Sequence, residues 1–273
     1  MIASLALRSA AVCVALLAAA PALAQDASPW QVDRHSQLRL LAGSRSGPVM
    51  LGGIVIQLAP GWHTYWRTPG DSGVPPRFDF SKSDNVEAVT ILWPAPDKFD
   101  DGAGGQSLGY VAKVVLPLRV VAKDAGKPVT LRAAISYAVC EKLCVPVEAT
   151  AELAFTSVAS TEDSALTAAL DTVPKPATLG DANPLTVRDI KRDGNRVLVD
   201  VVAPEGETNL YVEGPTPEWA LPVPKRQKEA PAGVKRFAFD LEGIPSGASA
   251  DGAALKLTLV GADKAYEFNV NLN

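Results

Sequence analysis

The chain has 273 residues, of which 47% are hydrophobic, and its formal net charge is −4. This apolar content supports a folded core, and the length suits one large or two small domains. The acidic balance and the lack of any basic stripe exclude nucleic acid as the expected partner.

Residues 1–24 have the pattern of a secretory signal peptide. An apolar run at 9–20 follows Arg8, and it is shorter than the roughly 20 residues that span a bilayer. The small-x-small motif at 22–24 predicts cleavage before Gln25. We therefore expect a periplasmic protein that does not span the membrane after cleavage.

Short segments with alternating apolar and polar residues follow, separated by many of the 22 prolines and 21 glycines. Alternation at period two is typical of half-buried strands. The expected strands in the first half are Gln37–Leu41, Met50–Leu58, Trp62–Arg67, Glu87–Trp93 and Val111–Val121.

Two further strands flank a pair of cysteines. Apolar residues alternate from Val129 to Tyr137, directly before Cys140, and again from Val147 to Phe155, after Cys144. The cysteines are therefore predicted at the connection between two antiparallel neighbours.

The second half continues this pattern after a short interruption. A helix is expected at Thr161–Thr172, capped by Ser160 or Thr161 and with Asp163 in its first turn. Proline and glycine between 174 and 184 indicate a linker. The strands expected after it include Arg196–Val202, Lys235–Leu241, Leu255–Val260 and Tyr266–Leu272.

The fold class expected from these segments is all-β, with two β-sandwich domains joined by a short helix and linker. The expected divisions are 1–24 for the signal peptide, 25–158 for the first sandwich, 159–183 for the helix and linker, and 184–273 for the second sandwich.

Cleavage would remove Cys13 and leave Cys140 and Cys144 in an oxidising compartment, where a disulfide is the default expectation. Three residues separate the two cysteines, whereas two separate those of a thioredoxin site. A disulfide that closes so short a loop does not link distant parts of the fold. We expect a local, labile bridge that serves thiol–disulfide exchange. The alternative is a structural bridge that pins a β-turn. Lys142 would favour a thiolate and Glu141 would oppose it.

A metal site is the competing chemistry, because two thiolates and a histidine can hold Zn(II) or Cu(I). Only His35 and His63 are available, neither is near the cysteines in sequence, and Met50 is the one methionine left after cleavage. We therefore expect no metal and no organic cofactor, with copper handling kept as an alternative.

Four separated motifs occur in order along the first half: GWHTYWRTPGDSGVPP at 61–76, WPAP at 93–96, SLGY at 107–110 with VLPL at 115–118, and YAVCEKLCVP at 137–146. Together they resemble the periplasmic N-terminal domain of the DsbD/ScsB family of membrane protein-disulfide reductases, and the likeness is closer to the ScsB branch. The resemblance covers about residues 30–155, and residues 183–273 resemble, more weakly, the second sandwich of longer members.

This resemblance implies an immunoglobulin-like fold in which Cys140 and Cys144 are the catalytic pair. It also implies a cap loop at Asp97–Ser107, whose acidic, glycine-rich sequence suits a mobile lid. Phe99 is the candidate shielding residue, and the site would be flanked by Trp62, Tyr65 and Tyr110.

The resemblance also implies partners. In the family this domain passes electrons from a membrane-embedded domain to periplasmic acceptors, which are thioredoxin-like or isomerase-like proteins. The sequence shows neither that membrane domain nor the family's C-terminal thioredoxin domain, so we expect a separate membrane electron donor. Its cysteine spacing is also shorter than in the best-known members. A non-catalytic periplasmic binding module with a structural disulfide is the alternative function.

Overall fold

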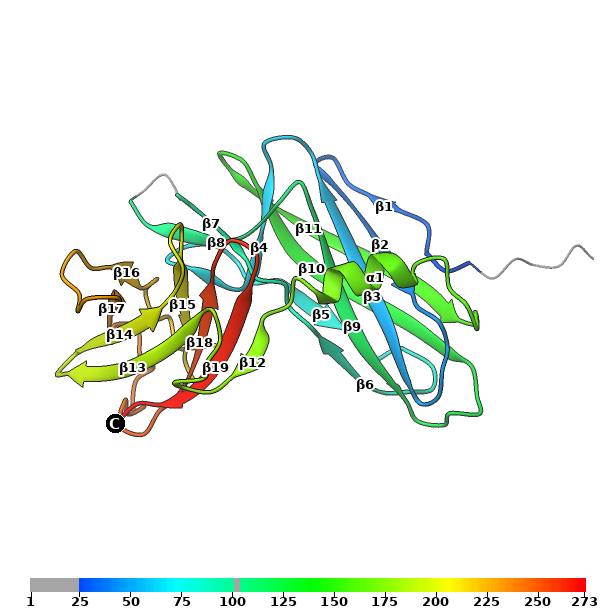
Figure 1. The fold of residues 1–273 in the computed structure, drawn as a ribbon. Coiled ribbons are helices and arrows are strands. Elements are labelled where there is room, and N and C mark those ends of the chain that lie inside the picture. The colour runs from blue at the N-terminus through cyan, green and yellow to red at the C-terminus, as the bar shows by residue number, and fades with distance from the viewer. Residues whose placement is uncertain (1–24, 101–103) are drawn as a thin grey trace, which may run out of the picture.

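Strands arranged in four sheets make up nearly all of the regular structure (Figure 1). The computed structural model describes residues 25–100 and 104–273, so the predicted signal peptide lies outside the described residues. The sheets form two sandwiches, connected through a single short helix. The expected all-β fold with two immunoglobulin-like sandwiches is confirmed.

The N-terminal sandwich contains two sheets. One has the strand order β1-β2-β3-β9-β6, and the other has the order β11-β10-β4-β8-β7 with β5 also paired to β10. The strands are β1 Gln31–Val32, β2 Ser36–Ala42, β3 Val49–Leu58, β4 His63–Gly70, β5 Arg77–Asp79, β6 Val86–Ile91, β7 Asp97–Asp100, β8 Gln106–Val111, β9 Lys113–Ala122, β10 Val129–Cys140 and β11 Cys144–Phe155.

The side chains that alternate in the two strands beside the cysteines bury their apolar face in the core of the N-terminal sandwich, as predicted. In β10 the side chains of Val129, Leu131 and Ile135 are buried, and β11 contributes Val147 and Phe155 to the same cluster. The two strands pair in antiparallel register along their whole length. Burial of one face of each strand supplies the main stabilisation of this sandwich.

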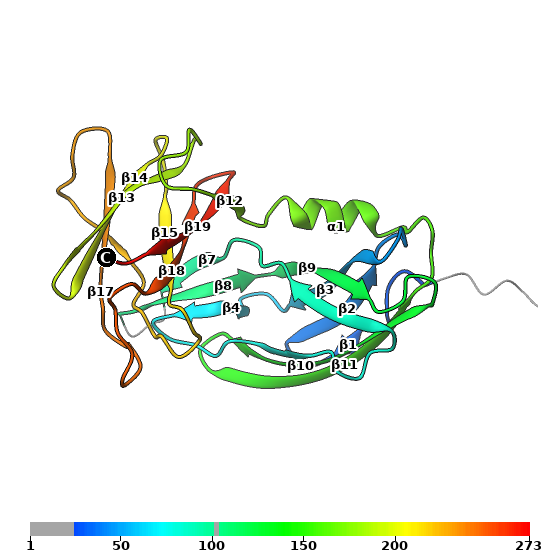
Figure 2. The same cartoon turned by 90° about the horizontal axis from the view of Figure 1, so that it is seen from below.

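Helix α1, Asp163–Leu170, covers the outer face of the sheet that contains β2, β3 and β9 (Figure 2). Leu166 packs there against Leu41 and Val55. The predicted cap is wrong: Glu162 is the N-cap and makes no side-chain cap bond. The Ser160 hydroxyl accepts the N–H of the N-cap residue Glu162 at 3.0 Å, rather than one inside the helix, and donates to the Ala42 carbonyl at 2.6 Å.

The C-terminal sandwich pairs a sheet of order β12-β19-β18-β15 with a sheet of order β13-β14-β17-β16. Part of the expected linker is a strand, since β12 pairs in parallel with β19. The strands are β12 Lys175–Ala177, β13 Thr186–Asp193, β14 Arg196–Val202, β15 Asn209–Glu213, β16 Lys225–Arg226, β17 Lys235–Asp240, β18 Ala254–Val260 and β19 Ala265–Asn271.

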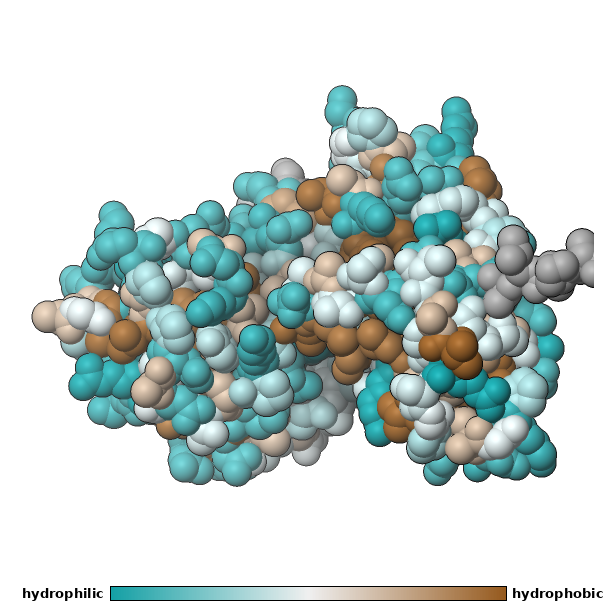
Figure 3. Space-filling model, turned by 45° about the vertical axis from the view of Figure 1, so that its right-hand side comes forward, coloured by the Kyte–Doolittle hydropathy of each residue, from teal (hydrophilic) through white to brown (hydrophobic). Residues whose placement is uncertain are grey.

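The two sandwiches share apolar contacts. Tyr211 and Val223 of the C-terminal sandwich belong to the core cluster of the N-terminal one. The rings of Trp66 and Tyr211 lie 6.0 Å apart between centroids. Figure 3 shows hydrophobic residues gathered near the junction of the two lobes, whereas hydrophilic residues cover most of the left-hand lobe.

Two expectations about the segment before β9 need correction. Ala112, at φ 58°, separates β8 from β9. The observed strand β9 therefore begins at Lys113, two residues after the start of the expected strand Val111–Val121. The expected cap loop Asp97–Ser107 is largely a hairpin, because β7 pairs with β8 through backbone groups that its glycine-rich composition does not reveal. Residues 101–103 of that segment lie outside the described residues.

Candidate redox site

The cysteine pair closes the β10–β11 hairpin. Cys140 ends β10, Cys144 begins β11, and the two residues are direct partners in the register. Their sulfur atoms are joined at 2.04 Å, with the Cα atoms 4.1 Å apart. The predicted position between antiparallel strands is confirmed.

The site lies on the outer face of its sheet, away from the sandwich core. Residues directly opposite each other in paired strands point to the same face. Cys144 pairs with Cys140, Cys140 with His63, and His63 with Val111, so these four residues form one row across the sheet. Val139 is one residue out of step with this row and is buried in the core.

The two cysteine residues differ in accessibility. Cys140 is only 2% exposed, in a small buried cluster with Tyr65 and Ala138. Cys144 is an exposed residue, and the preceding Leu143 is 80% exposed. A nucleophile or a partner disulfide therefore meets Cys144 first.

The Tyr65 hydroxyl reaches both sulfurs. It lies 3.2 Å from Sγ of Cys140, to which it donates a hydrogen bond, and 3.3 Å from Sγ of Cys144. A disulfide sulfur is a weak acceptor, whereas a thiolate accepts a stronger, charge-assisted bond. Tyr65 is thus placed to stabilise a thiolate when the bridge is reduced.

A pocket of about 360 Å³ opens beside the disulfide. Phe99 of β7 lines it and packs on His63, with ring centroids 4.4 Å apart and planes tilted by 53°. The expectation that Phe99 lies at the pair therefore agrees with the structure. The remaining lining residues are Tyr65, Ser72, Gly73, Val74, Asp100, Ser107, Glu141 and Lys142, together with both cysteines.

His63 is the site residue that the sequence did not single out. It lies 77 positions before Cys140 in the chain, yet β4 places it directly opposite that cysteine. The signal available was its i, i+2 spacing from Tyr65, which puts both side chains on one face of a strand. Burial lowers the pKa of His63 because the protonated ring loses solvation.

This shift predicts a pH dependence of stability. The unfolded chain takes up a proton on His63 near the usual value of 6.5, whereas the folded chain does so only at lower pH. The free energy of unfolding should therefore fall as the pH drops below 6.5, until the folded pKa is passed. Urea titrations of the native protein and His63→Gln between pH 7.5 and about pH 4.5 check this. The variant should lose part of the slope, and identical slopes would contradict the assignment.

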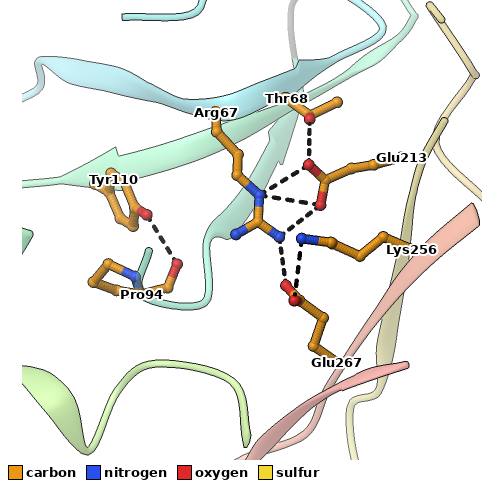
Figure 4. Close-up of polar contacts among 7 residues, drawn as sticks. All are labelled: Arg67, Thr68, Pro94, Tyr110, Glu213, Lys256 and Glu267. Carbon is orange, nitrogen blue, oxygen red and sulfur yellow. Dashed lines mark hydrogen bonds and ion pairs between the residues drawn. The ribbon is translucent and has the colours of Figure 1, made fainter. Parts of the chain in front are cut away.

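Tyr110 and Trp62 do not flank the pair as expected. Tyr110 pairs with Thr64 and so faces the core, where its buried hydroxyl donates to the Pro94 carbonyl at 2.9 Å (Figure 4). Trp62 stacks on His35, with ring centroids 3.7 Å apart. Neither residue lines the pocket: Tyr110 is opposite Thr64 rather than His63, and Trp62 lies before β4 begins.

Removing the Tyr65 hydroxyl should slow the chemistry without unfolding the protein. Tyr65→Phe keeps the buried ring and loses one hydrogen bond to the thiolate. A hydrogen bond to a charged group contributes about 1.5–3 kcal/mol, so alkylation of the reduced protein at pH 7 should be slower by about tenfold or more. Stopped-flow alkylation measures this, with Tyr110→Phe as the control that removes a hydroxyl away from the pocket.

No group of three histidine, cysteine or acidic side chains in the described residues forms a metal-binding cluster. Within the same residues, no helix has the length and apolar character required to cross a membrane.

Comparison with known proteins agrees with this arrangement. Residues 46–156 match the family described as "Thiol:disulfide interchange protein DsbD, N-terminal". The crystal structure of the N-terminal periplasmic domain of ScsB from Proteus mirabilis aligns with a TM-score of 0.74 and 21% identity, covering 91% of this chain and 98% of that one. The yeast GGA1 GAE domain aligns over 46% of this chain and 97% of its own, at 11% identity and a TM-score of 0.26, which supports no argument. Comparison with curated proteins gave no match.

Proposed function

We propose that this protein is a periplasmic thiol–disulfide oxidoreductase that works through Cys140 and Cys144, because residues 46–156 match the N-terminal domain of the DsbD family. The observation that carries the proposal is the pairing of one buried and one exposed cysteine under a single tyrosine hydroxyl. A purely structural bridge has no need of this asymmetry.

The exposed Cys144 acts first in the proposed exchange. Its thiolate attacks a disulfide of the partner, forms a mixed disulfide and releases one partner thiolate. Cys140 then attacks Sγ of Cys144, which restores the internal bridge and releases the second partner thiolate. Two electrons pass to the partner, and the two protons lost by the cysteines match those gained by the partner thiols.

Apolar side chains around the pair supply a docking surface for the partner. Leu143 of the turn, Val74 of the pocket and Val111 of the row that contains the cysteines are exposed, and so is Val145, which follows Cys144 in β11. Exposed apolar residues gathered at a reactive group favour protein contact. The proposed partners are thioredoxin-like or isomerase-like proteins of the periplasm.

Phe99 and His63 narrow the approach to the sulfurs from the β7 side. In the proposed cycle Phe99 moves aside when a partner docks. The dithiol of a separate membrane protein then reduces the Cys140–Cys144 bridge and completes the cycle.

The reduction potential of the bridge tests the proposed function. Structural disulfides of secreted proteins have potentials below about −300 mV, whereas exchange-active bridges are more oxidising. Equilibration of the protein with dithiothreitol and glutathione buffers should give a value above that limit. A value well below it would identify the bridge as structural and refute the exchange function.

A further inference from the structure

The segment that follows Tyr65 forms one wall of the redox pocket. Ser72, Gly73 and Val74 line the pocket directly. Gly73 lies against the Tyr65 ring so closely that a Cβ atom there would be 2.4 Å from Cε1 of the tyrosine. The position of Tyr65 over the sulfurs therefore depends on where this segment is held.

The C-terminal sandwich holds the beginning of the segment. The Arg67 guanidinium donates to both carboxylate oxygens of Glu213, at 2.6–3.1 Å, and to Glu267 at 2.6 Å (Figure 4). Thr68 donates to Glu213 at 2.9 Å, and Lys256 pairs with Glu267 at 3.3 Å. The three side chains joined directly, Arg67, Glu213 and Glu267, are only 15–22% exposed.

Partial burial makes this network a strong anchor. Burial disfavours the charge of Arg67, but hydrogen bonds and charges from Glu213 and Glu267 outweigh it and raise the arginine pKa. A bidentate arginine–carboxylate pair fixes orientation as well as distance. Loss of one partner would leave a partly buried charge without its match.

A second anchor holds the middle of the segment. One oxygen of Asp71 accepts the Val223 N–H of the C-terminal sandwich at 2.9 Å. The other accepts the Gln106 N–H of β8 at 2.9 Å. The Asp71 carboxylate thus ties the C-terminal sandwich to the pocket wall, one residue before Ser72 enters the pocket lining.

We propose that the C-terminal sandwich is a positioning domain for the redox site: by holding Arg67 and Asp71, it keeps Tyr65 over the two sulfurs. The inference rests on the proposed function and gives the second sandwich a role within it. Glu213 is the positioning residue with the most contacts, and it acts through β4 rather than by touching a sulfur.

Two variants of the full chain test this role at independent anchors. Glu213→Gln and Asp71→Asn keep side-chain size but weaken one anchor each. Each should slow alkylation of the reduced protein at pH 7 by about twofold or more, up to the effect of Tyr65→Phe. Asp200→Asn is the matched control, because Asp200 binds Arg236 at 2.6 and 2.7 Å entirely within the C-terminal sandwich. It should leave the rate unchanged.

A double-mutant cycle separates positioning from general destabilisation. If Glu213 acts through the tyrosine hydroxyl, Glu213→Gln should add little to the slowing already caused by Tyr65→Phe. Fully additive slowing, or native rates in both anchor variants, would overturn the proposal. If Glu213→Gln unfolds, Thr68→Val takes its place in the double-mutant cycle with Tyr65→Phe, because it removes only a single hydrogen bond to Glu213.

The alkylation readout also separates this proposal from the proposed function. It reports on the reduced thiols whether or not the pair exchanges with a partner. A reduction potential in the range of structural disulfides together with slowed anchor variants would refute exchange but leave the positioning role standing. A higher reduction potential together with native alkylation rates in the anchor variants would refute the positioning role and leave the exchange function standing.

Discussion

Cys140→Ala should accumulate as a stable mixed disulfide when mixed with an oxidised thioredoxin-like protein, whereas Cys144→Ala should not. Cys144 is exposed and can attack the partner, but without Cys140 nothing resolves the product. Cys140 is 2% exposed, so it reacts only after local opening. If opening requires about 3 kcal/mol, Cys144→Ala reacts about a hundredfold more slowly.

Non-reducing electrophoresis and intact-mass measurement follow the trapped species over time. The partner with its own attacking cysteine replaced is the control, because it has no disulfide to exchange and should give no adduct. Equal trapping by both single-cysteine variants would contradict the assignment of Cys144 as the attacking residue. Trapping by Cys144→Ala alone would reverse the order of the two steps.

Trp66→Ala should have the largest effect on stability. Trp66 is 0% exposed, and it contacts both the N-terminal core and Tyr211 of the other sandwich. Truncating so large a buried ring removes about 3–5 kcal/mol from the free energy of unfolding. No hydrogen-bond partner of its Nε1 occurs among the described residues, so the loss comes from ring packing and from the contact of the Arg67 guanidinium with the ring, 4.4 Å from its centroid.

Urea denaturation followed by circular dichroism measures this change. Trp62→Ala is the matched control: it removes the same ring from a half-buried position beside His35 and should cost clearly less. Because Trp66 touches both sandwiches, its loss should lower the unfolding midpoint of both. An effect no larger than that of Trp62→Ala would contradict its central position.

The period-two alternation of apolar residues predicted the long strands of this fold well and the short strands poorly. From Val129 to Phe155, side-chain alternation identified both strands and the face that they bury. The expected strands did not include β1, β5, β7, β8, β12, β15 or β16, and all of these except β8 have five residues or fewer. Such strands depend on backbone pairing with a distant neighbour, and local sequence carries little of that information.

The cysteines, Tyr65 and Phe99 could be found from the sequence and its family resemblance, but the rest of the site could not. Tyr110 was misplaced by one residue, which in a strand reverses the face, and Trp62 lies before β4 begins. His63 was missed because proximity was judged along the chain rather than across the sheet. The contacts of Arg67 with Glu213 and Glu267 join residues at least 146 positions apart, and nothing local predicts them.

The register of the β10–β11 hairpin limits how a partner can tell the two redox states apart. Cys140 and Cys144 are already opposite each other through backbone pairing, so opening the bridge removes no strand contact. Both forms should therefore present nearly the same surface outside the turn. The release of a partner after exchange must then depend on the sulfurs, the Tyr65 hydroxyl and the three turn residues. Only these few groups can make the partner's affinity for the oxidised form differ from its affinity for the reduced form.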